Sequence, residues 1–175
     1  MVTTTIPAPR SRVRVLLAAL VSPRTGALPA DIGLIAVRAV LALLFIYHGS
    51  RRLFGWFDGP GLHASDQYFA NTAHLHPGEL FAALGGIIEF GGGIAIALGL
   101  LARLAGAAIF VDMMMAIVTV TWDNGINATT GKSGYELNLA LGTLALVIAF
   151  FGAGRFSIDA LIERRLAGPD TSSSG

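Results

Sequence analysis

Residues 80–101 read LFAALGGIIEFGGGIAIALGLL and contain a single charged side chain, Glu89. The hydrocarbon core of a bilayer is about 30 Å thick, and a helix needs about 20 mostly apolar residues to cross it. This stretch has that length, so it predicts a transmembrane helix. Three further stretches qualify by the same measure, namely residues 32–53, 103–122 and 135–152. The sequence therefore predicts an all-α integral membrane protein, a bundle of four transmembrane helices joined by short connections.

The composition of the whole chain supports a membrane protein. Of the 175 residues, 54% are hydrophobic and 13% are charged, whereas about 25% of the residues in a soluble domain are charged. A chain of this size cannot bury so much apolar surface in a water-facing globule, so we expect lipid to cover part of it. The absence of cysteine excludes disulfides, thiolate nucleophiles and Fe–S clusters carried by this chain. The net charge of +1 gives no reason to expect a nucleic-acid partner.

Arginine is concentrated on one side of the predicted spans, and the positive-inside rule then predicts that both termini are cytoplasmic. We expect three parts: a basic N-terminal arm over residues 1–30 that is interfacial or disordered, a transmembrane domain over residues 31–162, and a disordered tail over residues 163–175. The arginines that define the cytoplasmic side are Arg10, Arg12, Arg14, Arg24, Arg103, Arg155, Arg164 and Arg165.

Every predicted span contains an ionisable residue, although such a group costs at least about 2.5–3.5 kcal/mol inside a bilayer. Counting from the cytoplasmic ends at about 1.5 Å per residue sorts these residues into two layers. The inner layer holds Arg38, Glu89 and Asp112. Because arginine stays charged when buried, we expect Arg38 to pair with one of these carboxylates. The outer layer holds His48 and Glu136, a pair that could shuttle protons near neutral pH.

Two interpretations of these residues stay open. A functional polar cavity would use the carboxylate that lacks a partner to hold a movable proton. Alternatively, the buried charges only fix helix packing, and His48 is a hydrogen-bonded histidine at a helix end. Glycines three and four residues on either side of Glu89 indicate that this face packs against protein rather than lipid. These glycines are Gly85, Gly86, Gly92 and Gly93.

The predicted outward loop, residues 54–79, is rich in aromatic residues and histidines. The aromatic residues are typical of interfacial anchors and would also suit the lip of a ligand entrance; they are Trp56, Phe57, Tyr68 and Phe69. His74 and His76 could donate imidazoles to a metal, but their spacing provides no fixed framework, so no metal site is predicted.

Five features occur in order along the chain: Arg38 early in the first span, then His48-Gly49-Ser50-Arg51-Arg52-Leu53, then Glu89-Phe90-Gly91-Gly92 through Leu98-Gly99-Leu100-Leu101-Ala102-Arg103, then Gly134-Tyr135-Glu136, and last Gly152-Ala153-Gly154-Arg155-Phe156-Ser157-Ile158-Asp159. Together they resemble the DoxX family of small four-helix bacterial membrane proteins. The resemblance covers residues 32–162.

The resemblance implies a multi-pass protein of the bacterial plasma (inner) membrane. It also implies either quinone-linked oxidoreduction, as in the small subunits of thiosulfate:quinone oxidoreductases, or a membrane complex of thiol and oxidative-stress defence. The residues that match the family pattern are Arg38, His48, Gly49, Arg52, Glu89, Gly92, Arg103 and Glu136. Arg52 stands where the family usually has lysine, which keeps the charge but does not suit a role that needs a deprotonated amine. Asp112 is not part of the family pattern.

Our first hypothesis is a membrane subunit of a quinone-linked oxidoreductase, with a polar intramembrane cavity for a quinone-like ligand. It assigns the chemistry to Glu89, Asp112 and Arg38, and a proton path to His48, Glu136 and Arg52. Soluble oxidoreductase or stress-defence proteins would be its partners. The alternative is a non-catalytic scaffold or lipid-binding module that recruits soluble enzymes. A small transporter ranks third because no pair of broken helices is visible. A homo-oligomer is compatible with each of these hypotheses.

Overall fold

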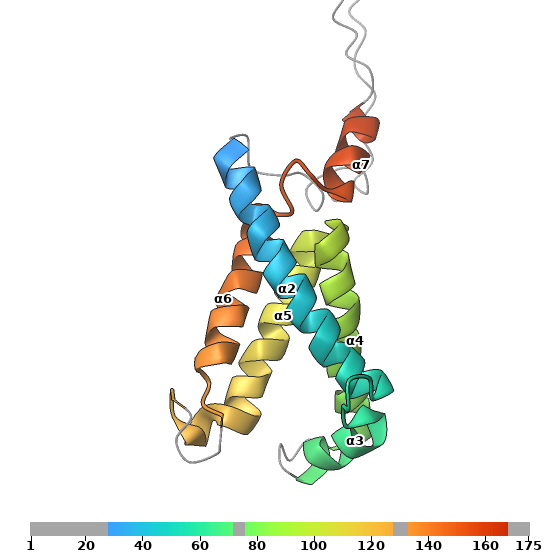
Figure 1. Ribbon diagram of the computed structural model, residues 1–175, viewed down its shortest axis with the longest axis vertical. Helices are drawn as coiled ribbons and strands as arrows, with labels where there is room; N and C mark the ends of the chain where they lie inside the picture. The colour runs from blue at the N-terminus through green and yellow to red at the C-terminus, as the bar shows by residue number, and fades with distance from the viewer. Residues whose placement is uncertain (1–27, 72–75, 128–132, 168–175) are drawn as a thin grey trace, which may run out of the picture.

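The computed structural model of the chain describes residues 28–71, 76–127 and 133–167, and these residues contain helices and no strand (Figure 1). The α-helices are α2 (Leu28–Phe54), α3 (Gly61–Asn71), α4 (Gly78–Leu98), α5 (Ala102–Ala116), α6 (Glu136–Phe151) and α7 (Ile158–Ala167). The prediction of an all-α protein is confirmed. Most of the expected arm (residues 1–27), the last part of the expected tail (residues 168–175) and His74 lie outside the described residues.

Within the described chain, three helical stretches are long and apolar enough to cross a membrane. They are α2, α4 and the continuous stretch Ala102–Asn124, in which the π-helical turn η1 (Ile117–Thr121) and the 3-10 turn η2 (Trp122–Asn124) extend α5. The fourth, α6, is apolar but has only 16 residues. These elements correspond to the four predicted spans and form a helical membrane bundle. That both termini are cytoplasmic stays a prediction.

The turn between the second and third spans begins earlier than the sequence predicts. Gly99 adopts a left-handed φ of 65°, and Leu101 follows with a φ of 48°. The N–H of Gly99 donates to the carbonyl of Ile96, and the N–H of Leu100 donates to the carbonyl of Ala95. This pattern closes a helix at a glycine. The second span therefore ends at Leu98 rather than at residue 101.

Helices α2 and α4 form one closely packed pair, and α5 and α6 form the other. Their approach depends on glycine, because a Cβ on Gly49 of α2 would overlap the backbone of Phe90 in α4. The four glycines around Glu89 also face neighbouring residues: Cβ atoms on Gly85, Gly86, Gly92 and Gly93 would meet Arg52, Leu53, Ile109 and Ile46, respectively. The core between the pairs contains almost fully buried side chains, including Leu41, Phe45, Ile96, Ile109 and Ile148.

The two helix pairs diverge toward one end of the bundle. Figure 1 shows α2, α4, α5 and α6 close together near α7 and spread apart toward α3, where the lower parts of α5 and α6 stand away from those of α2 and α4. We call these two ends the α7 end and the α3 end.

Two shorter helices lie in segments for which the sequence analysis predicted no helix. Helix α3 lies within the loop that was predicted to face outward, and it packs against α4. Helix α7 begins at Ile158, at the end of the expected transmembrane domain, and ends at Ala167, so its second half lies in the stretch expected to be a disordered tail. The Ser157 hydroxyl accepts a hydrogen bond from the N–H of Ala160 at 3.2 Å, which satisfies one of the free donors at the start of α7.

Asp159 of α7 fixes the start of α5. It is 2% exposed, and its two carboxylate oxygens accept hydrogen bonds from the N–H groups of Leu101 and Ala102 at 2.8 and 3.0 Å. The N–H of Asp159 in turn donates to the carbonyl of Gly99 at 2.9 Å. A carboxylate at a helix N-terminus satisfies free donors and is favoured by the helix dipole.

We therefore expect Asp159→Ala to lower the free energy of unfolding by about 1–3 kcal/mol, because the buried N–H of Ala102 and the part-buried N–H of Leu101 lose a charged acceptor. Thermal unfolding in a mild detergent, followed by circular dichroism, would measure the loss. Glu163→Ala on the same helix serves as the control and should change the stability by less than about 0.5 kcal/mol. Equal stability of the two variants would contradict this role of Asp159.

Candidate functional site

A cavity of about 390 Å³ lies between the diverging helix pairs at the α3 end. This volume falls in the range of about 300–1,000 Å³ that is usual for small-molecule sites. Most of the lining is apolar and includes Phe45, Phe81 and Met113. The polar residues in the lining come from every helix around the cavity and are His48, Arg52, Tyr68, Glu89, Asp112, Thr119, Thr121 and Asn138. The cavity is therefore mostly hydrophobic, with a small cluster of convergent polar groups.

Glu89 of α4 is the most deeply buried charged group of the cavity, at 3% exposed. Its Oε1 atom lies 3.1 Å from Nη2 of Arg52. Its Oε2 atom is also buried, and no described residue donates a hydrogen bond to it. A buried acceptor of this kind costs free energy unless a donor reaches it, so Oε2 is available to a bound ligand.

Arg52 lies between two carboxylates. A Cβ on Gly85 would be only 2.5 Å from Nη1 of Arg52 and 3.4 Å from Oδ1 of Asp112. Glycine at position 85 thus leaves the space through which the guanidinium passes between α4 and α5. Arg52 acts electrostatically on both Glu89 and Asp112. The cluster therefore contains two carboxylates for one guanidinium.

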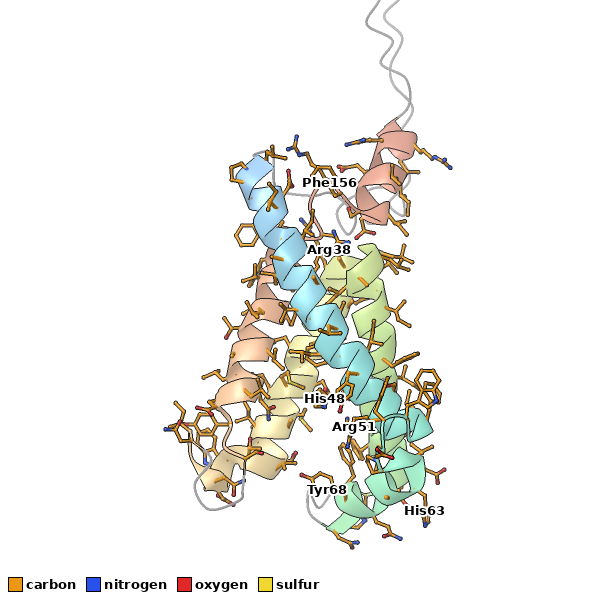
Figure 2. The ribbon with its side chains drawn as sticks, viewed as in Figure 1. Arg38, His48, Arg51, His63, Tyr68 and Phe156 are labelled. Atoms are coloured by element: carbon orange, nitrogen blue, oxygen red, sulfur yellow. The ribbon has the colours of Figure 1, made fainter. Side chains whose placement is uncertain are left out.

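Helix α3 contributes two aromatic residues, Tyr68 and Phe69, to the lining next to this cluster. The ring of Phe69 lies over Arg52, with 5.2 Å between the ring centroid and the guanidinium carbon, a cation–π arrangement. Tyr68 lines the cavity next to it. Partial burial raises the pKa of the Tyr68 hydroxyl above its usual range, so this hydroxyl keeps its proton and can donate a hydrogen bond. Figure 2 shows Tyr68 and His48 on the sides of α3 and α2 that face α5.

The third span changes its helical geometry where it borders the cavity. Residues 117–121 form the π-helical turn η1, and Thr119 and Thr121 of this turn line the cavity. Short π-helical turns within α-helices occur frequently at functional sites. Sequence reasoning missed both threonines and Asn138 of α6. The run Ile117-Val118-Thr119-Val120-Thr121 was a signal, since it puts β-branched and hydroxyl side chains into an otherwise regular span.

The predicted pairing of Arg38 with Glu89 or Asp112 is wrong. Arg38 lies toward the α7 end, next to Phe156 (Figure 2). Its guanidinium donates hydrogen bonds of 2.8–2.9 Å to four backbone carbonyls, those of Ile96, Ala97, Ala153 and Phe156. The first two carbonyls belong to the last turn of α4, where the helix dipole attracts a cation. Arg52, which the sequence analysis assigned to a proton path, contacts Glu89 instead.

The predicted pair of His48 and Glu136 is not formed either. His48 lines the cavity, but Glu136 is exposed at the first position of α6 and is not part of the lining. The next residues of α6, Leu137 and Asn138, face the cavity in its place. The two expected layers are thus replaced by one cluster around Arg52 at the α3 end and a separate Arg38 site at the α7 end.

A larger and more open hollow of about 670 Å³ lies at the α7 end. Its polar groups are Arg155, Arg164 and Ser157, with apolar side chains around them. Arg155 is held by an ion pair with Asp31, and Ser157 hydrogen-bonds to the carbonyl of Gly154. The described residues that line this hollow include no carboxylate. The smaller cavity at the α3 end is therefore the better candidate for proton chemistry.

Comparison with known proteins identifies the family. The model of the DoxX family matches residues 33–122, about half of the chain, and this range includes His48, Arg52, Glu89 and Asp112 of the cavity. The chain is also 27% identical over 135 residues to the inner membrane protein YqjF of Escherichia coli (strain K12), across 77% of this chain and 95% of that protein. No solved structure matches it. With its helical membrane bundle and its match to the family model, the chain belongs to the DoxX family.

Proposed function

We propose that this chain is the membrane subunit of a quinone-linked oxidoreductase system, and that the cavity at the α3 end binds a quinone-like ligand. The observation that carries the proposal is the buried carboxylate of Glu89, which has one oxygen without a hydrogen-bond partner in a mostly apolar cavity. A buried ionisable group inside a membrane bundle is a candidate functional site. The location proposed for the chain, the bacterial inner membrane, follows from the relative described above.

The residues of the cavity suit a ligand with a flat apolar ring and polar oxygens. Phe45, Phe81 and Ile88 provide apolar surface for the ring. Tyr68 and Arg52 provide donors for ring oxygens, and the carboxylates of Glu89 and Asp112 can hold or release a proton at the ligand. The guanidinium of Arg52 would stabilise negative charge that develops on an oxygen.

Electrons would have to pass through the ligand and a partner protein, because the chain has no cysteine to form a thiol couple. A soluble oxidoreductase or stress-defence enzyme that docks on the bundle would be that partner. With the predicted orientation, the cavity end of the bundle faces outward and α7 faces the cytoplasm.

Filling the cavity tests the proposal. Ala116 lines the cavity, so Ala116→Phe should weaken the binding of a short-chain ubiquinone analogue at least about tenfold, a loss of about 1.4 kcal/mol. Calorimetric titration of the purified protein in lipid nanodiscs would measure the affinity.

Ala107→Phe is the matched control, because Ala107 is exposed on the same helix and does not line the cavity. It should bind the analogue as tightly as the wild type. Two results would refute the proposal: no saturable binding by the wild type, or wild-type affinity in the Ala116→Phe variant.

A further inference from the structure

The free oxygen of Glu89 limits which groups of a ligand can bind next to it. Oε1 of Glu89 is already paired with Arg52 at 3.1 Å, whereas Oε2 is buried and accepts nothing from the described residues. The ion pair with Arg52 favours the ionised form of Glu89, and an ionised carboxylate can only accept hydrogen bonds. A ligand group that satisfies Oε2 must therefore carry a hydrogen on oxygen or nitrogen.

The charges around Glu89 also favour a ligand group that donates a hydrogen bond. Asp112 borders the same space, so the cavity offers two carboxylates, while Arg52 is the one arginine or lysine in the described lining. Arg52 lies close to both carboxylates, and the ring of Phe69 lies over its guanidinium. Glu89 and Asp112 thus share one guanidinium, and Oε2 of Glu89 receives no hydrogen bond from the described residues.

We infer that the cavity binds the reduced, hydroquinone form of its ligand in preference to the quinone, with a phenolic O–H donating to Oε2 of Glu89. This inference rests on the proposed function and specifies the redox form that the site prefers. A hydroquinone has two O–H donors, whereas a quinone has only carbonyl acceptors, which a carboxylate repels. A site built around one polar partner strongly rejects an analogue that lacks the matching group, because the buried group is then left unpaired.

The preference can be measured directly in the wild type. In anaerobic nanodiscs, a short-chain ubiquinol should bind at least about tenfold tighter than the matching ubiquinone. Because the reduced form is held more tightly, the two-electron potential of the bound couple should rise, by about 30 mV for a tenfold preference.

A change in the ligand tests the same contact without altering the protein. The dimethyl ether of the quinol keeps the ring and the chain but lacks both O–H donors. It should bind at least about tenfold more weakly than the quinol. Equal affinity for the ether and the quinol would overturn the inference.

A change in the protein provides the complementary test. Glu89→Gln replaces the free acceptor with an amide that can also donate, so the preference for the quinol should fall below about threefold or reverse. Glu79→Gln, an exposed position on the same helix, should keep the wild-type preference. A Glu89→Gln variant that folds and retains the full preference would show that the contact with Oε2 does not set it.

The outcomes separate this inference from the proposed function. If neither redox form binds to the wild type, the proposed function fails and the inference fails with it. If both forms bind with equal affinity, or if the quinone binds more tightly, the inference fails while the proposed function stands. Tighter quinol binding that depends on both the O–H groups and Glu89 supports both.

Discussion

Replacing Arg38 with methionine should lower the free energy of unfolding by at least about 3 kcal/mol. Arg38 is 6% exposed, and its guanidinium donates hydrogen bonds to four carbonyls at once. Each buried carbonyl that loses its donor costs about 1–3 kcal/mol, and methionine supplies no donor. The change would also release the end of α4 from the segment that follows α6, because Arg38 joins Ile96 to Ala153. Unfolding of the detergent-solubilised protein by added dodecyl sulfate would measure the loss.

Two further variants define the cause of this loss. Arg38→Lys should be intermediate, because an ammonium has three donors and lacks the planar geometry that reaches separate carbonyls. Arg165→Met removes an exposed arginine from α7 and should leave stability within about 0.5 kcal/mol of wild type. If Arg38→Met were as stable as Arg165→Met, the four hydrogen bonds would not contribute to the fold.

Replacing Gly49 with leucine should have the second large effect, a loss of about 3 kcal/mol or more. A Cβ at this position would overlap the backbone of Phe90 in α4. Backbone cannot move aside as the end of a side chain can, so α2 and α4 would have to separate. Overpacking of a close contact costs about 1–3 kcal/mol and sometimes more, and leucine adds three carbons beyond Cβ. The same unfolding titration with dodecyl sulfate would measure this loss of stability.

Gly91→Leu is the matched control, since a Cβ on Gly91 would meet nothing within 4 Å. Leucine has a higher helix propensity than glycine by up to about 1 kcal/mol, so this variant should be equal to the wild type or slightly more stable. The two substitutions are chemically identical, but only Gly49→Leu should lower the free energy of unfolding. A similar loss in both variants would contradict close helix contact at Gly49 as the cause.

The fold class could be predicted from the sequence because hydrophobic length alone identifies membrane spans. The length of residues 80–101 sufficed to predict a membrane helix, although its end was misplaced by three residues, because the left-handed Gly99 stops α4. Helix α3 could not be predicted in this way. It has only 11 residues and a nearly neutral hydrophobicity, and its position follows from packing against α4.

The candidate site was predicted in part. The depths estimated from residue number placed Glu89 and Asp112 in the same layer, and both residues line the cavity. It failed for Arg38 because counting locates the Cα atom and not the direction of a long side chain, which here reaches the carbonyls at the end of α4. For the same reason, Arg52 was assigned to a proton path and not paired with Glu89. Its contact with Glu89 depends on the space left by Gly85, and that space is visible only in three dimensions.

The shortness of α6 has a consequence for the surrounding lipid. Its 16 residues rise about 24 Å at 1.5 Å per residue, compared with about 30 Å for a typical hydrocarbon core. At one end of α6 the rings of Trp122 and Tyr135 stack with their centroids 6.0 Å apart. Such aromatic groups prefer the level of the lipid headgroups. The bilayer next to α6 must therefore become thinner to match the length of this helix. This hydrophobic mismatch makes the α6 edge of the bundle responsive to bilayer thickness.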